Sequence, residues 1–431
     1  MLRLLPILFL ASAVFAQQAE TPDQLFSKAE KLRRDGKRDE AVGVYQQVIL
    51  AQPEHVLAHK YYQEIMIALG HEKEILDYYQ QLLASDPRKP LYHLLLGKLL
   101  PDDQALLEFQ KCIELDPKFF WGHWALAGIQ LRLGKTDEAE KSARTALTIT
   151  DNQYAHTMLG AVLAKKASKD QKGREAILRD AAVELQRAID LDKEYDPAFL
   201  ALGMVLATAG DFKNAIRALE AGQKLNPSEP GFPQALAQVY TEQGRSLMDA
   251  VKTLASMSIK EQQAGKKASA AEVLAQAKAK GALTILSFQK ALEYAPEVAA
   301  TREHLFAARF LLANLALMEL ASSMMDGKYD DAAKCADAAI EEMKKVQAID
   351  PANAKAKQGV AVSLLARANA GLGQGKSLLD AGKKPEARKA LEGALADAQA
   401  SAATPDLDPK ALAEARKLNT AILEALAKAK D

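Results

Sequence analysis

The sequence predicts an all-α protein, specifically a right-handed α-solenoid of stacked antiparallel helix hairpins. Four stretches of the 431 residues follow one 34-residue template. No segment shows the period-2 alternation of apolar and polar residues that is typical of a strand. A fixed repeat of this length indicates helical hairpins, each of which buries its apolar face against the next. Such stacks usually present a binding surface rather than a catalytic centre.

The four clearest repeats begin at Pro22, Val56, Phe120 and Asp196. The fifteenth place of each repeat is a turn glycine: Gly36, Gly70, Gly134 and Gly210. A small or aliphatic residue follows five places later: Ala41, Ile75, Ala139 and Ala215. Three repeats close with Pro53, Pro87 and Pro227, and proline ends a helix because it lacks an N–H donor.

Two further places complete the pattern. Place 8 holds a small residue in three repeats (Ala29, Ala127 and Gly203), and place 24 holds a large one (Tyr45, Tyr79 and Leu219). This pattern resembles the tetratricopeptide repeat. The resemblance implies a superhelix of hairpins that binds other proteins, with small residues at the helix crossings and a large side chain in the gap to the next hairpin.

Degenerate repeats extend the array over residues 17–244. One begins at Pro90 and lacks about one helical turn, and another begins at Gln153. The second carries a lysine- and arginine-rich insertion around Lys165–Arg179, which we expect to form a loop. A last first helix is expected from Pro230 to Gly244.

Residues 245–431 are richer in alanine, lysine and glutamate and have fewer turn signals. Gly327 and Gly382 are each followed five places later by an alanine, as in the array. We therefore expect longer, irregular, tetratricopeptide-like hairpins, with a flexible joint at Gly265-Lys266-Lys267. A separate helical bundle is the alternative that the composition leaves open.

The N-terminus predicts export. Arg3 precedes an apolar run, Leu4–Phe15, and Val14-Phe15-Ala16 has the small-x-small form of a cleavage site before Gln17. Residues 1–16 are therefore expected to be a signal peptide, as in an exported bacterial-type member of the family. No cysteine follows the cleavage site, so we expect a periplasmic or secreted protein without a lipid anchor.

The charge balance disfavours several partners. The chain has 56 basic and 56 acidic residues, so losing Arg3 leaves a net charge of about −1. Nucleic acid and anionic lipid are poor candidates without a basic excess. The apolar stretch Leu305–Met325 is interrupted by Arg309, Asn314 and Glu319, which favours a buried helix over a membrane span.

Other patterns carry little chemistry. Cys112 and Cys335 lie several hairpins apart, which predicts two free thiols, since repeats of a solenoid touch only their neighbours. Ala370–Ser377 fits a loose phosphate-binding loop, but the alanine-rich run before it reads as helix. We interpret its glycines as a joint between helices.

The histidines are interpreted as structural. His59, His93 and His123 recur at place 4 of successive repeats, too far apart to share a metal ion. No pattern of nucleophile, histidine and acid stands out. No cofactor, metal or enzymatic activity is predicted.

The concave face is the predicted site of function. In proteins similar to this one, places 2, 5, 9, 12 and 13 of each first helix line the groove. Those places hold Leu57, Lys60, Leu91, Leu94, Lys98, Trp121, Trp124, Tyr154, Leu200 and Met204. Both tryptophans of the chain belong to this set. They are either anchors for a peptide segment or part of the core covered by neighbouring hairpins.

The predicted function is a non-enzymatic scaffold or adaptor that binds a polypeptide partner in this groove. The alternative is a structural subunit of a cell-envelope assembly or export complex, held by lateral contacts of the C-terminal helices. The sequence leaves the partner and the oligomeric state open.

Overall fold

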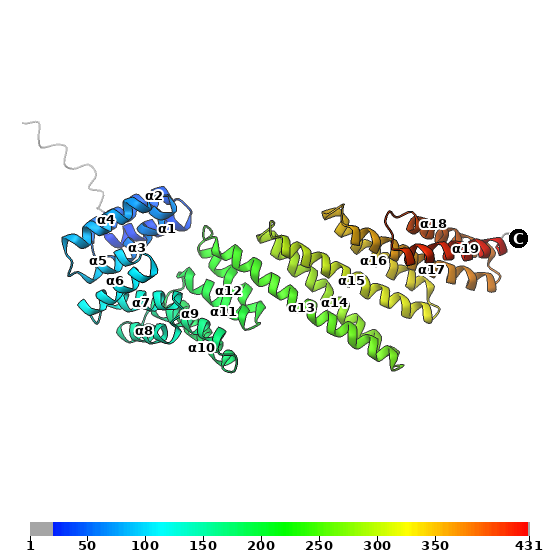
Figure 1. The fold of residues 1–431 in the computed structure, drawn as a ribbon, viewed down its shortest axis with the longest axis horizontal. Coiled ribbons are helices and arrows are strands. Elements are labelled where there is room, and N and C mark those ends of the chain that lie inside the picture. The colour runs from blue at the N-terminus through cyan, green and yellow to red at the C-terminus, as the bar shows by residue number, and fades with distance from the viewer. Residues whose placement is uncertain (1–19, 430–431) are drawn as a thin grey trace, which may run out of the picture. The chain divides into compact units, whose positions relative to one another are not determined.

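The computed structural model describes residues 20–429, which form nineteen helices and contain no strand (Figure 1). Successive helices pair into antiparallel hairpins, so the predicted all-α solenoid is confirmed for the described residues. The predicted signal peptide, residues 1–16, lies outside them. The chain divides into two compact units, residues 1–235 and 236–431. The change of character expected at residue 244 falls inside helix α13, Gly231–Gln263, which runs through both units.

Unit 1 contains six hairpins in its described part. Its helices are α1 (Pro22–Arg34), α2 (Arg38–Ala51), α3 (Val56–Ala68), α4 (Glu72–Ser85), α5 (Pro90–Gly97), α6 (Asp102–Leu115), α7 (Phe120–Arg132), α8 (Thr136–Ile149), α9 (Gln153–Lys169), α10 (Arg174–Leu191), α11 (Asp196–Thr208) and α12 (Phe212–Leu225). Each first helix contacts its own second helix, and the second helix of each of the first five hairpins contacts the next hairpin.

Glycines in the left-handed conformation make most hairpin turns. Gly36 has φ +74° and Gly70 φ +84°, values that a side chain would strain. The other turn glycines with this conformation are Gly134, Gly210, Gly265, Gly327 and Gly382. The four turns that the template predicts are therefore confirmed.

The helix crossings are built as the repeat predicts. Ala41 and Ala215 are fully buried, which lets the two helices of a hairpin approach closely. Tyr45 and Tyr79 are fully buried between hairpins, where their rings fill the space that the small residues leave. The buried apolar residues of unit 1 form clusters that follow one another along the array, the two largest spanning Leu25 to Ile129 and Ala127 to Val205.

The insertion in the fifth hairpin is helical, so the expected loop at Lys165–Arg179 is wrong. It lengthens α9 to 17 residues and α10 to 18, and the turn between them is confined to residues 170–173. Lysine, arginine, alanine and glutamate are strong helix formers, and their propensity extends both helices here.

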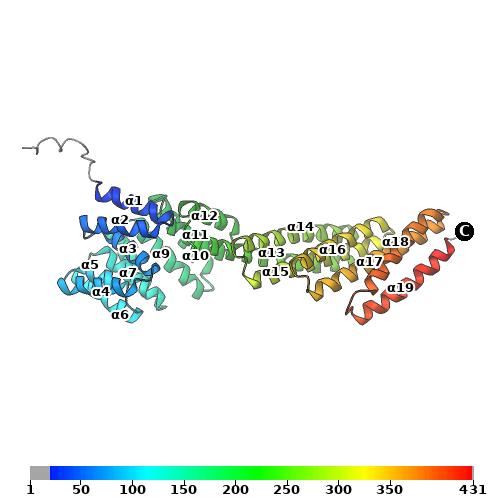
Figure 2. The ribbon, with the colours of Figure 1, turned by 90° about the horizontal axis from the view of Figure 1, so that it is seen from above.

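Unit 2 consists of longer hairpins and a final single helix, which lie side by side in Figures 1 and 2. After α13 its helices are α14 (Lys267–Tyr294), α15 (Ala299–Met325), α16 (Tyr329–Ile349), α17 (Ala354–Asp380), α18 (Lys384–Ala402) and α19 (Pro409–Lys428). Gly265, with φ +75°, is the turn of the hairpin α13–α14. The interpretation of this segment as a flexible joint is therefore corrected: it forms the same turn as the array.

The glycines of Ala370–Ser377 lie inside α17, so neither a phosphate-binding loop nor a joint between helices forms there. A Cβ atom at Gly373 would stand 2.3 Å from the Tyr329 ring, and one at Gly375 would stand 2.5 Å from Leu391. The glycines therefore allow α17 to approach α16 and α18 closely.

Helix α15 is the one described helix that is long and apolar enough to cross a membrane by length and composition. In this structure it lies between α14 and α16. Its Leu305, Phe306 and Leu315 are buried in the hydrophobic core. Arg309 is also buried, and its guanidinium pairs with Glu342 of α16 at 2.7 Å.

Both cysteines are free thiols, as the sequence predicts. Cys112 is fully buried, and its Sγ atom donates to the carbonyl of Pro90 at 3.2 Å. Burial raises the pKa of this thiol to about 12. Cys112 therefore acts as a small core residue.

Candidate functional site

The predicted groove residues all belong to unit 1, but they differ in exposure. Leu91 and Leu94 are 4% and 1% exposed and belong to the hydrophobic core, so neither offers a surface to a ligand here. The half-buried members are Leu57, Lys60, Lys98, Trp121, Trp124, Tyr154, Leu200 and Met204. This half-buried subset is the candidate binding surface.

Four aromatic rings of this face form a continuous row, which we call the aromatic strip: Trp124, Trp121, Tyr154 and Tyr195. The Trp121 ring centroid lies 5.7 Å from that of Trp124 and 5.0 Å from that of Tyr154. The Tyr154 and Tyr195 centroids are 4.9 Å apart. The Trp124 indole N–H also donates to the Tyr154 carbonyl at 3.2 Å. The Trp121–Trp124 and Tyr154–Tyr195 contacts are edge-to-face and the Trp121–Tyr154 contact is tilted, and such contacts fix the rings relative to each other.

Tyr195 was not among the predicted site residues. It is the residue just before α11, and it is 8% exposed. Phe119 holds the equivalent place before α7. The repeat template starts at the first residue of each first helix. It therefore leaves out the aromatic residue just before that helix, which was the signal that could have identified Tyr195.

Two lysines of the candidate surface lie near each other, and the charge of one of them, Lys60, acts on Tyr195 of the strip. The Lys60 ammonium stands 4.3 Å from the Tyr61 ring centroid and 3.7 Å from a Glu64 carboxylate oxygen. The Lys98 backbone N–H donates to the Leu94 carbonyl at 3.2 Å, whereas its ammonium group has no hydrogen bond or ion pair among the described residues. Burial, and then the charge of Lys60, lower the pKa of Lys98 to about 7. An anionic group placed next to Lys98 would therefore accept a hydrogen bond from it. The same group would raise the pKa of Lys98 and favour its protonated, charged form.

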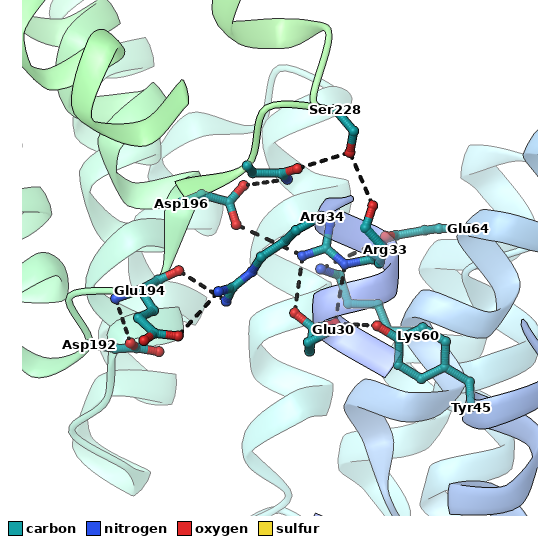
Figure 3. Close-up of polar contacts among 11 residues, drawn as sticks. Glu30, Arg33, Arg34, Tyr45, Lys60, Glu64, Asp192, Glu194, Asp196 and Ser228 are labelled. Carbon is teal, nitrogen blue, oxygen red and sulfur yellow. Dashed lines mark hydrogen bonds and ion pairs between the residues drawn. The ribbon is translucent and has the colours of Figure 1, made fainter. Parts of the chain in front are cut away.

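The first hairpin touches the sixth, which closes unit 1 on itself (Figure 3). Arg34 Nη1 pairs with Glu194 at 3.2 Å, and its Nη2 donates to the Glu194 carbonyl at 3.2 Å. Arg33 lies 3.9 Å from Asp196, and the Ser228 hydroxyl donates to the Arg33 carbonyl at 3.0 Å. We call these interactions the closing contact. They join α1 to the loop before α11, to the first residue of α11 and to the loop after α12.

Glu30 holds Arg33 in position for this contact. Its two carboxylate oxygens accept from Arg33 Nε at 3.1 Å and Nη2 at 3.0 Å, and one of them also accepts from the Tyr45 hydroxyl. Burial and the neighbouring Glu30 charge raise the pKa of Tyr45, so its hydroxyl stays protonated as a donor. Two-point pairing of an arginine with a carboxylate fixes its orientation.

A cavity of about 480 Å³ lies behind the closing contact. Its walls include the rings of Phe26, Tyr61, Tyr154 and Tyr195, together with Glu30 and Arg34. Residues from the first, second, fifth and sixth hairpins therefore meet at one cavity. Two members of the aromatic strip line it, so the strip continues from the tryptophans to the closing contact.

The recurrent histidines tie successive repeats together. His59 Nε2–H donates to the Pro53 carbonyl at 3.0 Å, and His93 does the same to Pro87 at 2.9 Å. His123 donates to Pro117 at 2.9 Å. Each bond spans six residues, from place 4 of one repeat to the proline that closes the repeat before. The predicted structural interpretation agrees with these bonds, and no metal-binding group occurs among residues 20–429.

The repeated hairpins define a helical-repeat protein. We call the face of unit 1 that carries the aromatic strip its inner face. The tetratricopeptide repeat model matches residues 196–229, which form α11, α12 and the loop that follows. Residues 196–229 therefore carry a tetratricopeptide repeat, within a helical-repeat fold that suits a protein-interaction scaffold. No curated protein matches the sequence.

Several solved structures of tetratricopeptide-repeat proteins are similar to parts of this chain. YrrB, described as a tetratricopeptide-repeat protein with an unusual peptide-binding site, is 18% identical over 52% of this chain and 96% of its own, with a TM-score of 0.31. A thermophilic tetratricopeptide-repeat protein of Thermus thermophilus, TTC0263, is 21% identical over 55% and 98%, at 0.33. A tetratricopeptide-repeat protein of Parabacteroides merdae is 10% identical over 67% and 98%, at 0.36.

Proposed function

We propose that unit 1 binds a segment of a partner polypeptide on its inner face, with Trp121 and Trp124 as anchors. The observation that carries this proposal is the aromatic strip. Its two indole rings are half-buried, so each combines fixed geometry with free surface. Tryptophan in such a setting is the residue that most often dominates binding energy at protein interfaces.

The charges beside the strip predict the chemistry of the partner. The charge of Lys60 acts on Tyr195 of the strip, and Lys98 lies near Lys60 and Glu64 without an ion pair of its own among the described residues. We therefore expect a segment that carries an apolar side chain for the tryptophans and an aspartate or glutamate for Lys98. Binding of that acid should raise the pKa of Lys98 and take up a proton.

The test is selection of peptides from a displayed random library on the full chain, followed by affinity measurement with three variants. Trp121→Ala and Trp124→Ala should each weaken binding of the selected peptide by about 2 kcal/mol or more. Tyr78→Ala is the matched control, because this ring is exposed on α4 and lies outside the strip. Equal affinity for all three variants would remove the strip from the binding site.

A second role is favoured by the surface of unit 2. Leu283 and Leu286 of α14 are 52% and 51% exposed, and a spacing of three places them on one helix face. We propose, as the alternative function, that this face holds the chain in a cell-envelope assembly or export complex. The double variant Leu283→Glu/Leu286→Glu should then lose the assembly while Trp121→Ala keeps it. The reverse result favours the inner face of unit 1.

Export of the chain is part of both proposals. The apolar run before Gln17 supports cleavage there and release outside the cytoplasm. Cell fractionation with N-terminal sequencing tests it. A chain that keeps its first sixteen residues and stays in the cytoplasm would contradict export and leave the binding face unaffected.

A further inference from the structure

The closing contact differs in kind from the contacts that hold the stack. Successive hairpins are joined through buried apolar side chains, of which Tyr45, Val48 and Ile75 are at most 1% exposed. The first and sixth hairpins are joined mainly by charged and hydroxyl groups. Apolar burial is strong and insensitive to salt, whereas ion pairs near water are weak and screened.

The ion pairs of the closing contact are incomplete. The Glu194 side chain is 74% exposed, so water competes for its pair with Arg34. Arg34 Nε is buried and has no hydrogen-bond partner among the described residues. The Arg33–Asp196 separation, 3.9 Å, is near the limit for an ion pair. The first hairpin can therefore leave the sixth at a small cost in free energy, while its own packing on α3 remains.

Separation at this contact would change what reaches the aromatic strip. Phe26 and Arg34 of α1 form one side of the cavity, and Tyr154 and Tyr195 form the other. Removing α1 from its place takes away one wall and opens the Tyr154 end of the strip. Trp121 directly adjoins Tyr154, so a partner segment gains room beside the tryptophans.

We propose that the closing contact is a latch that controls access to the inner face of unit 1. The closed state holds α1 against the sixth hairpin, and the open state admits the partner segment. Small rotations distributed over the hairpin interfaces are enough for such an opening, as in other domain movements by shear. This inference rests on the proposed function for its biological meaning, but the latch itself is testable on the free protein.

Intrinsic fluorescence reports on the latch directly, because both tryptophans of the chain lie in the strip. We would measure acrylamide quenching of the full-length protein. Glu194→Arg and Arg34→Glu should each raise the open-to-closed ratio about two- to fivefold, the effect expected for loss of an exposed pair, and so increase quenching. The charge swap Arg34→Glu/Glu194→Arg should restore the wild-type value. Circular dichroism should show unchanged helix content in every variant.

A disulfide across the closing contact tests the closed state, because it should hold the first and sixth hairpins together. A Cβ atom at Gly36 would lie 3.5 Å from Ser228 Cβ, within the roughly 3.5–4.5 Å that a disulfide needs. The variant Gly36→Cys/Ser228→Cys, made with Cys335→Ser, should keep quenching low at high salt until a reductant is added. Gly36→Cys alone is the matched control, because this position has φ +74° and any side chain there is strained.

Failure of the latch and failure of the proposed function give different results. If quenching is the same in the charge-reversed, swapped and oxidised proteins, the latch proposal is contradicted. The proposed binding of a peptide on the inner face is not affected by that result. If quenching responds and oxidation blocks the selected peptide until reduction, the latch is supported. If quenching responds but the peptide binds the oxidised and reduced forms equally, control of access is overturned. If no peptide binds the wild-type chain, the proposed function fails while the mechanical latch remains.

Discussion

The buried ring of His59 accepts a hydrogen bond from the hydroxyl of Tyr79, 2.8 Å away on the second helix of the same hairpin. With Nε2–H donating to Pro53, both ring nitrogens are satisfied by the neutral form. Burial lowers the pKa of His59 to about 4. The unfolded chain therefore binds a proton at His59 more readily than the folded chain.

This relationship predicts an acid sensitivity. The stabilisation is fully present above the unfolded pKa, near 6.5, and is lost as the pH falls towards 4. Relative to His59→Asn, the wild type should lose about 2 kcal/mol of its stability advantage between pH 7 and pH 5. Urea denaturation of both proteins at the two pH values measures the difference. An advantage independent of pH would show that His59 is not buried in the neutral form.

A second prediction concerns the two tryptophans. Because both are half-buried, their truncation to alanine should cost less stability than the roughly 3–5 kcal/mol of a fully buried tryptophan. The loss should be larger for Trp124, which also loses its bond to the Tyr154 carbonyl. Melting temperature and peptide affinity measured on the same proteins separate the effects. A variant that melts early but binds normally while folded would make these rings structural only.

The helix crossings give a third prediction. Ala41 and Ala215 have no exposed surface, so Ala41→Leu and Ala215→Leu should each cost about 1–3 kcal/mol through overpacking. In a linear array the damage should stay near the altered hairpin. Hydrogen exchange resolved along the chain measures it. A uniform loss of protection in both units would contradict the prediction.

The fourth prediction concerns a buried ion pair in unit 2. Glu342 is 13% exposed and pairs with the buried Arg309, so Glu342→Gln leaves a buried charge uncompensated and should cost about 3–5 kcal/mol. Glu341→Gln is the matched control, because Glu341 is 68% exposed and pairs with Lys345 on the same helix. That change should cost less than about 0.5 kcal/mol. Denaturation curves with similar midpoints for the two variants would refute the difference.

Local features of the fold were predictable because they depend on residues close in sequence. A glycine at place 15 and an alanine five places later determine a turn and a crossing, and both occur in the structure at Gly36 and Ala41. The same reasoning failed where one sequence pattern is compatible with two structures, a break between helices or a close contact between helices. The glycines around Gly373 resemble a breaker in sequence, but within α17 they serve to admit the Tyr329 ring.

The candidate site was predictable only in part. The template placed Trp121 and Tyr154 on one face, and their rings do meet. It also placed Leu94 there, yet that side chain is buried in the hydrophobic core among residues of neighbouring hairpins. The Arg34–Glu194 pair spans 160 residues and depends on the sum of all the turns between, so no local pattern reveals it.

The histidine-to-proline bonds have a consequence for how unit 1 obtains its curvature. Each bond fixes the loop between adjacent repeats, because it joins two residues six positions apart across that loop. Arg302 makes the same bond to the Pro296 carbonyl in unit 2. The loop between repeats thus requires a side-chain hydrogen-bond donor at place 4, which can be a histidine or an arginine. Because the angle is set locally and then repeated, the count of repeats decides which hairpins meet. One extra hairpin would carry Arg34 past Glu194 and turn a closed ring into an open spiral.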